Sequence, residues 1–196
     1  MHKRIFILIV SFSLFTSIPL YAQRIGEHFR HFLGFELEED SFADVQKQLG
    51  NAMLIEKGDA GEYEASISYF IPQCHTIVNF KSDELGGRKH KIEGLVLQKS
   101  SSFEVSRKKA LVCSNIKCDE LTIGGLRLGL TSKEVEHLLG KRISWKGNRA
   151  SISIKGQEPV RTIEGKIKQF DVYISIVGIF RNNVLEELNI WISRTN

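Results

Sequence analysis

Apolar and polar residues alternate along this chain with two different periods. In the segments 41–50 and 131–140, apolar side chains recur one helical turn apart, which predicts two short amphipathic helices. Most of the remaining chain carries β-branched and aromatic residues in short runs, such as 66–71 and 75–80, which is the pattern of strands. Two helices among many strands predict an α+β fold.

The two helical segments resemble each other at an offset of 90 residues. Both read Ser or Thr, two residues, an acid, Val, three residues, Leu and Gly. A hydroxyl followed three residues later by an acid forms a capping box, and a closing glycine suits the left-handed residue that ends a helix. The expected caps are Ser41 with Asp44 and Thr131 with Glu134, and the closing glycines are Gly50 and Gly140.

Strands are expected before and after each helix. A short leading strand with a period of two is expected at 35–38 and at 126–130. The first half then predicts strands near 52–58, 62–71, 75–81 and 90–98, and the second half near 142–146, 149–155, 159–165, 168–180 and 184–193. The expected turns in the second half are Lys146-Gly147-Asn148, Lys155-Gly156-Gln157 and Asn182-Asn183.

The repeated helix therefore predicts two tandem modules, each a short helix packed on an antiparallel sheet. The expected division is 23–98 for the first module, 99–122 for a connecting segment and 123–196 for the second module. A helix packed on one face of such a sheet leaves the other face free for solvent or for binding.

The N-terminus has the three parts of a secretory signal peptide. Met1 to Arg4 is basic, the following residues to Leu20 are almost entirely apolar, and Ala22 offers a small residue for cleavage. We expect a leader of residues 1–22 and a periplasmic or secreted mature chain. Gln23 stands where a lipoprotein would need cysteine, and no second apolar run follows, so no stable membrane anchor is expected.

The second helical segment with its approach, residues 128–140, resembles the opening of the β-lactamase-inhibitory-protein-like module. The small lipoproteins that assist assembly of outer-membrane β-barrels have a similar opening. Their pattern, Gly-Met-Thr/Ser-x-x-x-Val-x-x-x-Leu-Gly, has Leu130 here in place of Met, and the first copy departs further, with Glu39-Asp40 in place of Gly-Met. Two modules in one exported chain are similar to the inhibitory protein itself. The resemblance implies a concave sheet surface that grips another protein, and it carries over no contact residue.

The charge balance argues against a nucleic-acid partner. The chain has 27 Lys and Arg against 23 Asp and Glu, and removal of Lys3 and Arg4 with the leader leaves a net charge of +2. The densest basic run is Arg107-Lys108-Lys109, which is typical of a solvated surface rather than of a binding stripe.

All three cysteines lie in the part expected to be exported, where disulfides form. Cys113 and Cys118 are five positions apart around a turn-prone sequence and are the expected disulfide pair. A bond from Cys74 to either of them is the alternative. No metal site is expected, because too few further ligands lie nearby in the sequence.

Enzyme motifs give no catalytic assignment and no cofactor. Cys74-His75 are neighbours on an expected strand and would point to opposite faces. His28 and His31 are interleaved with phenylalanines, which favours an N-terminal packing segment over a metal site. His137 is expected on the exposed side of its helix, and the glycines between 124 and 129 lack the spacing of a phosphate-binding loop.

The leading hypothesis is therefore a non-enzymatic, exported protein-binding module whose partner is another envelope or extracellular protein. It predicts an exposed sheet face bearing aromatic residues, although many aromatic residues of a sheet belong to the core. The alternatives are a small-ligand carrier or hydrolase that uses a cleft between the modules, and a structural envelope protein without a ligand. The aromatic candidates for the exposed face are Tyr69, Phe80, Tyr173, Phe180 and Trp191.

Overall fold

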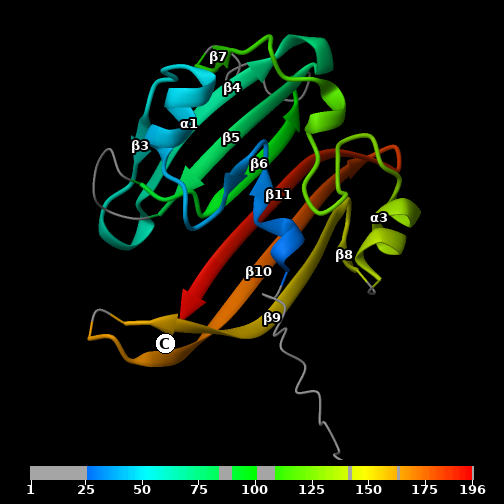
Figure 1. The fold of residues 1–196 in the computed structure, drawn as a ribbon. Coiled ribbons are helices and arrows are strands. Elements are labelled where there is room, and N and C mark those ends of the chain that lie inside the picture. The colour runs from blue at the N-terminus through cyan, green and yellow to red at the C-terminus, as the bar shows by residue number, and fades with distance from the viewer. Residues whose placement is uncertain (1–25, 84–89, 101–108, 141–142, 163, 196) are drawn as a thin grey trace, which may run out of the picture.

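The computed structural model describes residues 26–83, 90–100, 109–140, 143–162 and 164–195. The expected leader lies outside these residues, as do the middle of the loop that joins the last two strands of the first half and the basic pair Arg107-Lys108. The described elements form one large, mostly antiparallel sheet with two α-helices, which confirms the α+β class (Figure 1).

The helices, 3-10 turns and strands follow one another in a simple order along the chain. They are η1 (Glu27–Phe29), β1 (His31–Phe32), β2 (Phe35–Glu36), α1 (Phe42–Leu49), β3 (Ile55–Lys57), η2 (Ala60–Glu62), β4 (Glu64–Ile71), η3 (Pro72–Cys74), β5 (Thr76–Ser82), β6 (Gly94–Lys99), β7 (Leu111–Val112), η5 (Cys118–Glu120), α3 (Ser132–Leu139), β8 (Ser144–Lys146), β9 (Arg149–Arg161), β10 (Ile167–Arg181) and β11 (Val184–Thr195).

The main sheet runs in the order β3-β4-β5-β6-β11-β10-β9-β8, and the short β7 pairs in parallel with β4. Strands of the first half of the chain therefore occupy one side of the sheet, and strands of the second half occupy the other. The two sides meet where β6 pairs antiparallel with β11, for example at Leu97 and Leu188. β1 and β2 form a separate two-stranded hairpin.

Both helices begin and end at the positions that their caps predict. Asp44 Oδ2 accepts hydrogen bonds from the backbone N–H of Ser41 (2.9 Å) and from its hydroxyl (2.6 Å). Glu134 Oε2 accepts the equivalent pair from Thr131, each at 2.7 Å. These bonds hold the pKa of each carboxyl below its usual range. Among the described residues, no helix has the length and apolar character needed to cross a bilayer.

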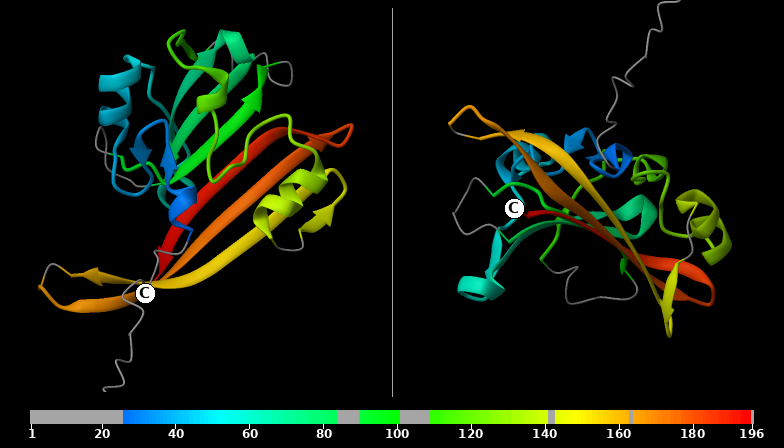
Figure 2. Two further views of the ribbon diagram at one scale, coloured as in Figure 1. Left: turned by 45° about the vertical axis from the view of Figure 1, so that its right-hand side comes forward. Right: turned by 90° about the horizontal axis from the view of Figure 1, so that it is seen from below.

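The two helices and the β1–β2 hairpin lie on the same side of the sheet, as Figure 2 shows. Their apolar side chains pack on alternate strand residues in a single hydrophobic cluster that spans both halves, including Val45 and Val135 of the helices and Leu97 and Ile190 of the central strands. Because strand side chains alternate between faces, this packing fixes which residues point to the opposite face.

The second half differs from its expected strand pattern. The predicted turn at residues 155–157 is wrong, because β9 continues through Gly156, which pairs with Val172 of β10. Pro159 is tolerated in this strand because β8 pairs with β9 only as far as Ser151, so the outer edge of β9 is unpaired there. The turn lies instead around Gly165, which has a positive φ of 77°.

The leading strand expected at 126–130 is also wrong. Gly124, Gly125 and Gly129 all have positive φ, and the segment is a series of turns with a single bridge from Ile123 to Leu126. The leading strand expected at 35–38 forms only in part, as the two-residue β2 (Phe35–Glu36). The hairpin turn at Asn182 and Asn183 is confirmed, since both have positive φ (50° and 64°) and Arg181 pairs with Val184.

Candidate functional site

The sheet face opposite the helices, which we call the open face, is mostly polar, although the register also places the buried apolar residues Phe70, Ile77 and Val96 on its first-half part. Its side chains are identified by the strand register, since residues paired across the strands share a face. They include seven serines (Ser66, Ser68, Ser144, Ser151, Ser153, Ser175, Ser193), the charged residues Lys57, Glu64, Lys81, Lys146, Arg149, Lys155, Asp171 and Glu187, and the amides Asn79, Gln98, Gln157 and Asn189.

Two of the five aromatic candidates lie on this face. Tyr173 and Trp191 are half-buried residues of β10 and β11. The other three, Tyr69, Phe80 and Phe180, are buried in the core, in agreement with the expectation that many aromatic residues of a sheet belong to the core. Tyr69 and Phe80 make an edge-to-face ring contact there, and the Tyr69 hydroxyl donates to the carbonyl of Gly50 at 2.7 Å.

Trp191 lies flat on the sheet beside the junction of the two halves. It pairs with Gly94 of β6, and a Cβ at Gly94 would stand 2.3 Å from the indole Cε3 atom. Only glycine leaves room for the ring at this position. Across the sheet from Trp191 the same row continues with the small, exposed side chains of Ser175 and Ser153, and Trp191 itself is half-buried.

Lys155, Asp171 and Gln157 form a polar cluster next to Tyr173. Lys155 Nζ lies 2.9 Å from Asp171 Oδ2 and 5.1 Å from the centre of the Tyr173 ring. Gln157 Nε2 donates to Asp171 Oδ1 at 2.9 Å. Hydrogen bonds from Gln157 and Lys155 lower the pKa of Asp171, and bonding to Tyr173 and Asp171 raises the pKa of Lys155, so both groups are charged at neutral pH. The cluster orients an aromatic ring and a cation on strands β9 and β10.

A shallow hollow of about 380 Å³ lies on the open face across the junction. Glu187 of β11 accepts a 2.9 Å hydrogen bond from Gln98 of β6 and a 2.8 Å bond from Asn189, so polar contacts as well as the backbone ladder join the two halves. Lys81 forms an ion pair with Glu64 at 2.8 Å within the same hollow. Most ligand pockets are lined mainly by apolar groups. This hollow is lined mainly by polar side chains, many of them bonded to one another, with Ile55 and Val96 as its apolar residues.

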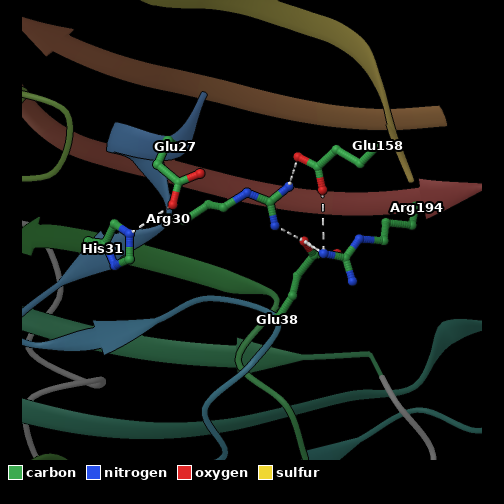
Figure 3. A network of polar contacts seen from close by, with 6 residues as sticks. All are labelled: Glu27, Arg30, His31, Glu38, Glu158 and Arg194. Atoms are coloured by element: carbon green, nitrogen blue, oxygen red, sulfur yellow. Dashed lines mark hydrogen bonds and ion pairs between the residues drawn. The ribbon is translucent and has the colours of Figure 1, made fainter. Parts of the chain in front are cut away.

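The covered side of the sheet holds a buried ionic network. The guanidinium of Arg30, which is 0 % exposed, binds Glu38 and lies 2.7 Å from Glu158 of β9. Arg194 of β11 approaches the same two carboxylates at 3.3 and 3.6 Å, as Figure 3 shows. Two cations and two anions balance one another, so the network ties the N-terminal segment to the base of the β9–β10 hairpin. This network was not predicted from the sequence. The position of Arg30 between Phe29 and Phe32 is the one local pattern that could have indicated a buried arginine.

The disulfide joins Cys74 to Cys118, which was the alternative pairing, and the expected Cys113–Cys118 bond is wrong. η3 and η5 bring Cys74 and Cys118 to a Cα–Cα distance of 5.5 Å, whereas Cys113 follows β7, points into the core and is a free thiol. The bond attaches the connecting segment to the first half of the sheet.

Cys74 and His75 do not form a nucleophile–base pair, because the sulfur of Cys74 is bonded to Cys118. Cys74 ends a 3-10 turn rather than lying on a strand, and His75 after it is exposed with a positive φ of 47°. His137 is exposed on α3, as expected. Phe29 and Phe32 are buried, so the N-terminal segment does pack on the core, while His28 and His31 are exposed.

No protein-family model matches this chain, and no curated protein or solved structure matches it significantly.

Proposed function

We propose that this chain is an exported, non-enzymatic protein-binding module, and that the open face is the surface that binds its partner. The observation that carries the proposal is the accessible Trp191 beside the oriented Tyr173–Lys155 pair, at the centre of a polar face that spans both halves of the chain. Tryptophan and tyrosine are enriched among the few residues that dominate the binding energy of protein interfaces. The partner is another envelope or extracellular protein.

The proposal includes a tandem origin for the two halves. Each contributes one eight-residue helix followed by four antiparallel strands, and the helices begin at residues 42 and 132, offset by the same 90 positions as the sequence motif. The strand order places the last strand of each half at the centre. This organisation supports the resemblance to the β-lactamase-inhibitory-protein-like module, whose implied function is binding of another protein by its sheet.

Affinity capture from envelope extracts tests the proposal with matched variants. Trp191→Ser combined with Tyr173→Ser removes both aromatic side chains from the open face. Leu138→Ser removes an exposed apolar side chain (47 % exposed) from α3 on the opposite side. We expect the wild-type chain and the Leu138 variant to capture the same partner reproducibly. The double variant should capture at least tenfold less of that partner. Equal capture by all three proteins would refute the role of the open face.

Export is tested separately by sequencing the N-terminus of the mature protein. We expect it to begin at Gln23, after removal of the leader. An intact Met1 on the protein recovered from cells would contradict export by a cleaved signal peptide.

A small-ligand carrier is the second candidate, and the 380 Å³ hollow is the observation that favours it. A nuclear magnetic resonance screen with polar small molecules distinguishes the two functions. Shifts confined to Gln98, Asn189 and their neighbours would favour the carrier, and the protein-binding proposal expects no such saturable site.

A further inference from the structure

Three side chains with metal-binding groups meet on the N-terminal segment, away from the open face. His31 and Glu36 are directly paired across the β1–β2 hairpin, and Glu27 lies four residues before His31, in η1. The ligand atoms of all three lie within 4.8 Å of one another, and His31 Nε2 is 3.4 Å from Glu27 Oε1. Figure 3 shows Glu27 and His31 facing each other beside the buried ionic network.

The backbone that carries these three side chains is held rigidly by its neighbours. Phe29, Phe32 and Phe35 are buried in the core, and Arg30 is fixed by two carboxylates. Residues that alternate with buried neighbours point outward, so His31 (52 % exposed) and Glu27 (39 % exposed) are accessible. Anchored ligands lose little freedom on binding an ion, which is the preorganisation that a metal site requires.

We propose that Glu27, His31 and Glu36 bind one divalent transition-metal ion, with Zn²⁺ as the best match. Neighbouring ligands of a tetrahedral zinc site lie about 3.3 Å apart when the bonds are about 2.0 Å long, and the His31–Glu27 distance of 3.4 Å already satisfies this spacing. Two carboxylates neutralise the charge of the ion. The imidazole selects Zn²⁺ over Ca²⁺, which prefers oxygen ligands.

Such an ion would join η1 to both strands of the hairpin. The three ligands come from only ten residues, so the metal would close the N-terminal segment on itself and stabilise the fold through mass action, because the unfolded chain lacks the assembled site. Three protein ligands leave a coordination position open for water or for a group from another molecule. This inference is independent of the proposed role of the open face.

Isothermal titration calorimetry of the tag-free, metal-stripped full chain with zinc chloride tests the proposal. We expect saturable binding of one ion per chain, and a Zn²⁺-dependent rise in melting temperature. His31→Ala should weaken binding at least about tenfold, since even losing a group that only orients a ligand costs that much. Glu36→Gln should also weaken Zn²⁺ binding. This variant provides a second test if the His31 variant fails to fold.

His137→Ala is the matched control, because it removes an exposed histidine from α3 outside the cluster. It should bind Zn²⁺ as the wild-type chain does. A hundredfold excess of calcium chloride should leave Zn²⁺ binding unchanged. The proposal is overturned if no saturable binding occurs, if folded His31→Ala binds as tightly as the wild type, or if Ca²⁺ displaces Zn²⁺, which would mark an ordinary acidic surface.

Discussion

Arg30 shows how a single charged residue can organise the packing of an apolar segment. Its guanidinium has no exposure to solvent, and its charge is balanced by Glu38 and Glu158, which come from parts of the chain 8 and 128 residues away. The hydrogen bonds have direction, so the network positions the N-terminal segment more specifically than apolar contacts would. Its neighbours Phe29 and Phe32 supply the apolar burial.

Removal of Arg30 should therefore be costly. Arg30→Leu leaves two buried carboxylates with only Arg194 beside them, and breaking a buried ion pair on one side costs about 3–5 kcal/mol. Urea denaturation should show this loss of stability, while the control Arg161→Leu, an exposed residue at the far end of β9, should change it by less than about 0.5 kcal/mol. Equal effects of the two changes would show that the network contributes no specific stability.

The charged form of the Glu93 side chain destabilises the folded protein. Burial, followed by its interactions with Asp83, raises its pKa from an ordinary 4.5 to about 7. Between these two values the folded chain keeps a proton that the unfolded chain releases, so stability falls as pH rises from about 4.5 to 7 and then levels off.

Glu93→Gln should remove this dependence. The variant should melt at a higher temperature than the wild type at pH 8, and the difference should shrink toward pH 5, where both side chains are neutral in the folded protein. Calorimetry across this pH range measures the difference. A gap that stays constant between pH 5 and pH 8 would contradict the raised pKa.

Among the elements, the helices were the most predictable from the sequence. Caps, periodicity and closing glycines are local, so Ser41 and Thr131 located both helices correctly. Gly140 adopts the left-handed conformation that was expected, whereas Gly50 has a positive φ of 102° but an extended ψ, so that detail was wrong.

Features that depend on distant partners were predicted less well. The length of β9 follows from pairing with β10, and this outweighs the local turn preference of Gly156. Cys118 pairs with Cys74 because β4 and β7 run side by side, which sequence spacing does not reveal. The sequence named Tyr173 and Trp191 as candidates for the exposed face together with Tyr69 and Phe80. Only the strand register shows that the first two lie on the open face and the other two on the covered face.

The cap of α3 provides a test at the element scale. Thr131→Ala removes the hydroxyl that donates to Glu134 and accepts from its backbone N–H, and loss of such a cap typically costs about 1 kcal/mol. Denaturation of this variant should show that loss. Lys133→Ala on the exposed side of the same helix should leave stability nearly unchanged, and a larger effect there would argue against the cap.

The Cys74–Cys118 bond provides a second test. It closes a separation of 44 residues, for which loop entropy predicts about 4 kcal/mol of stabilisation. Cys118→Ser should lose a large part of this. Peptide mapping without reduction should recover Cys74 linked to Cys118, with Cys113 labelled by a thiol reagent only after unfolding. A Cys113–Cys118 peptide would contradict the structure.

At the scale of the whole molecule, the antiparallel β6–β11 pair makes one sheet from the two halves. The helices cover one side of this sheet (Figures 1 and 2), and the other side is the open face. Trp191 lies on the open face where β11 pairs with Gly94 of β6. The β9–β10 hairpin extends this sheet further, since residues 158–161 of β9 pair with 167–170 of β10, whereas β11 pairs with β10 only from Asp171 onward. Under the proposed function, both halves would contribute to one large binding surface rather than to two separate sites.

Site-specific photocrosslinking in intact cells tests this central claim most directly. A photoreactive residue at the exposed Ser153 stands on the open face in the row of Trp191, separated from it by Ser175, and one at Lys133 stands on α3 on the opposite side. We expect a discrete crosslinked protein from Ser153 and none from Lys133, with the crosslink lost when Trp191 is changed to Ser. Crosslinking from Lys133 alone, or from Ser153 without dependence on Trp191, would contradict binding at the open face.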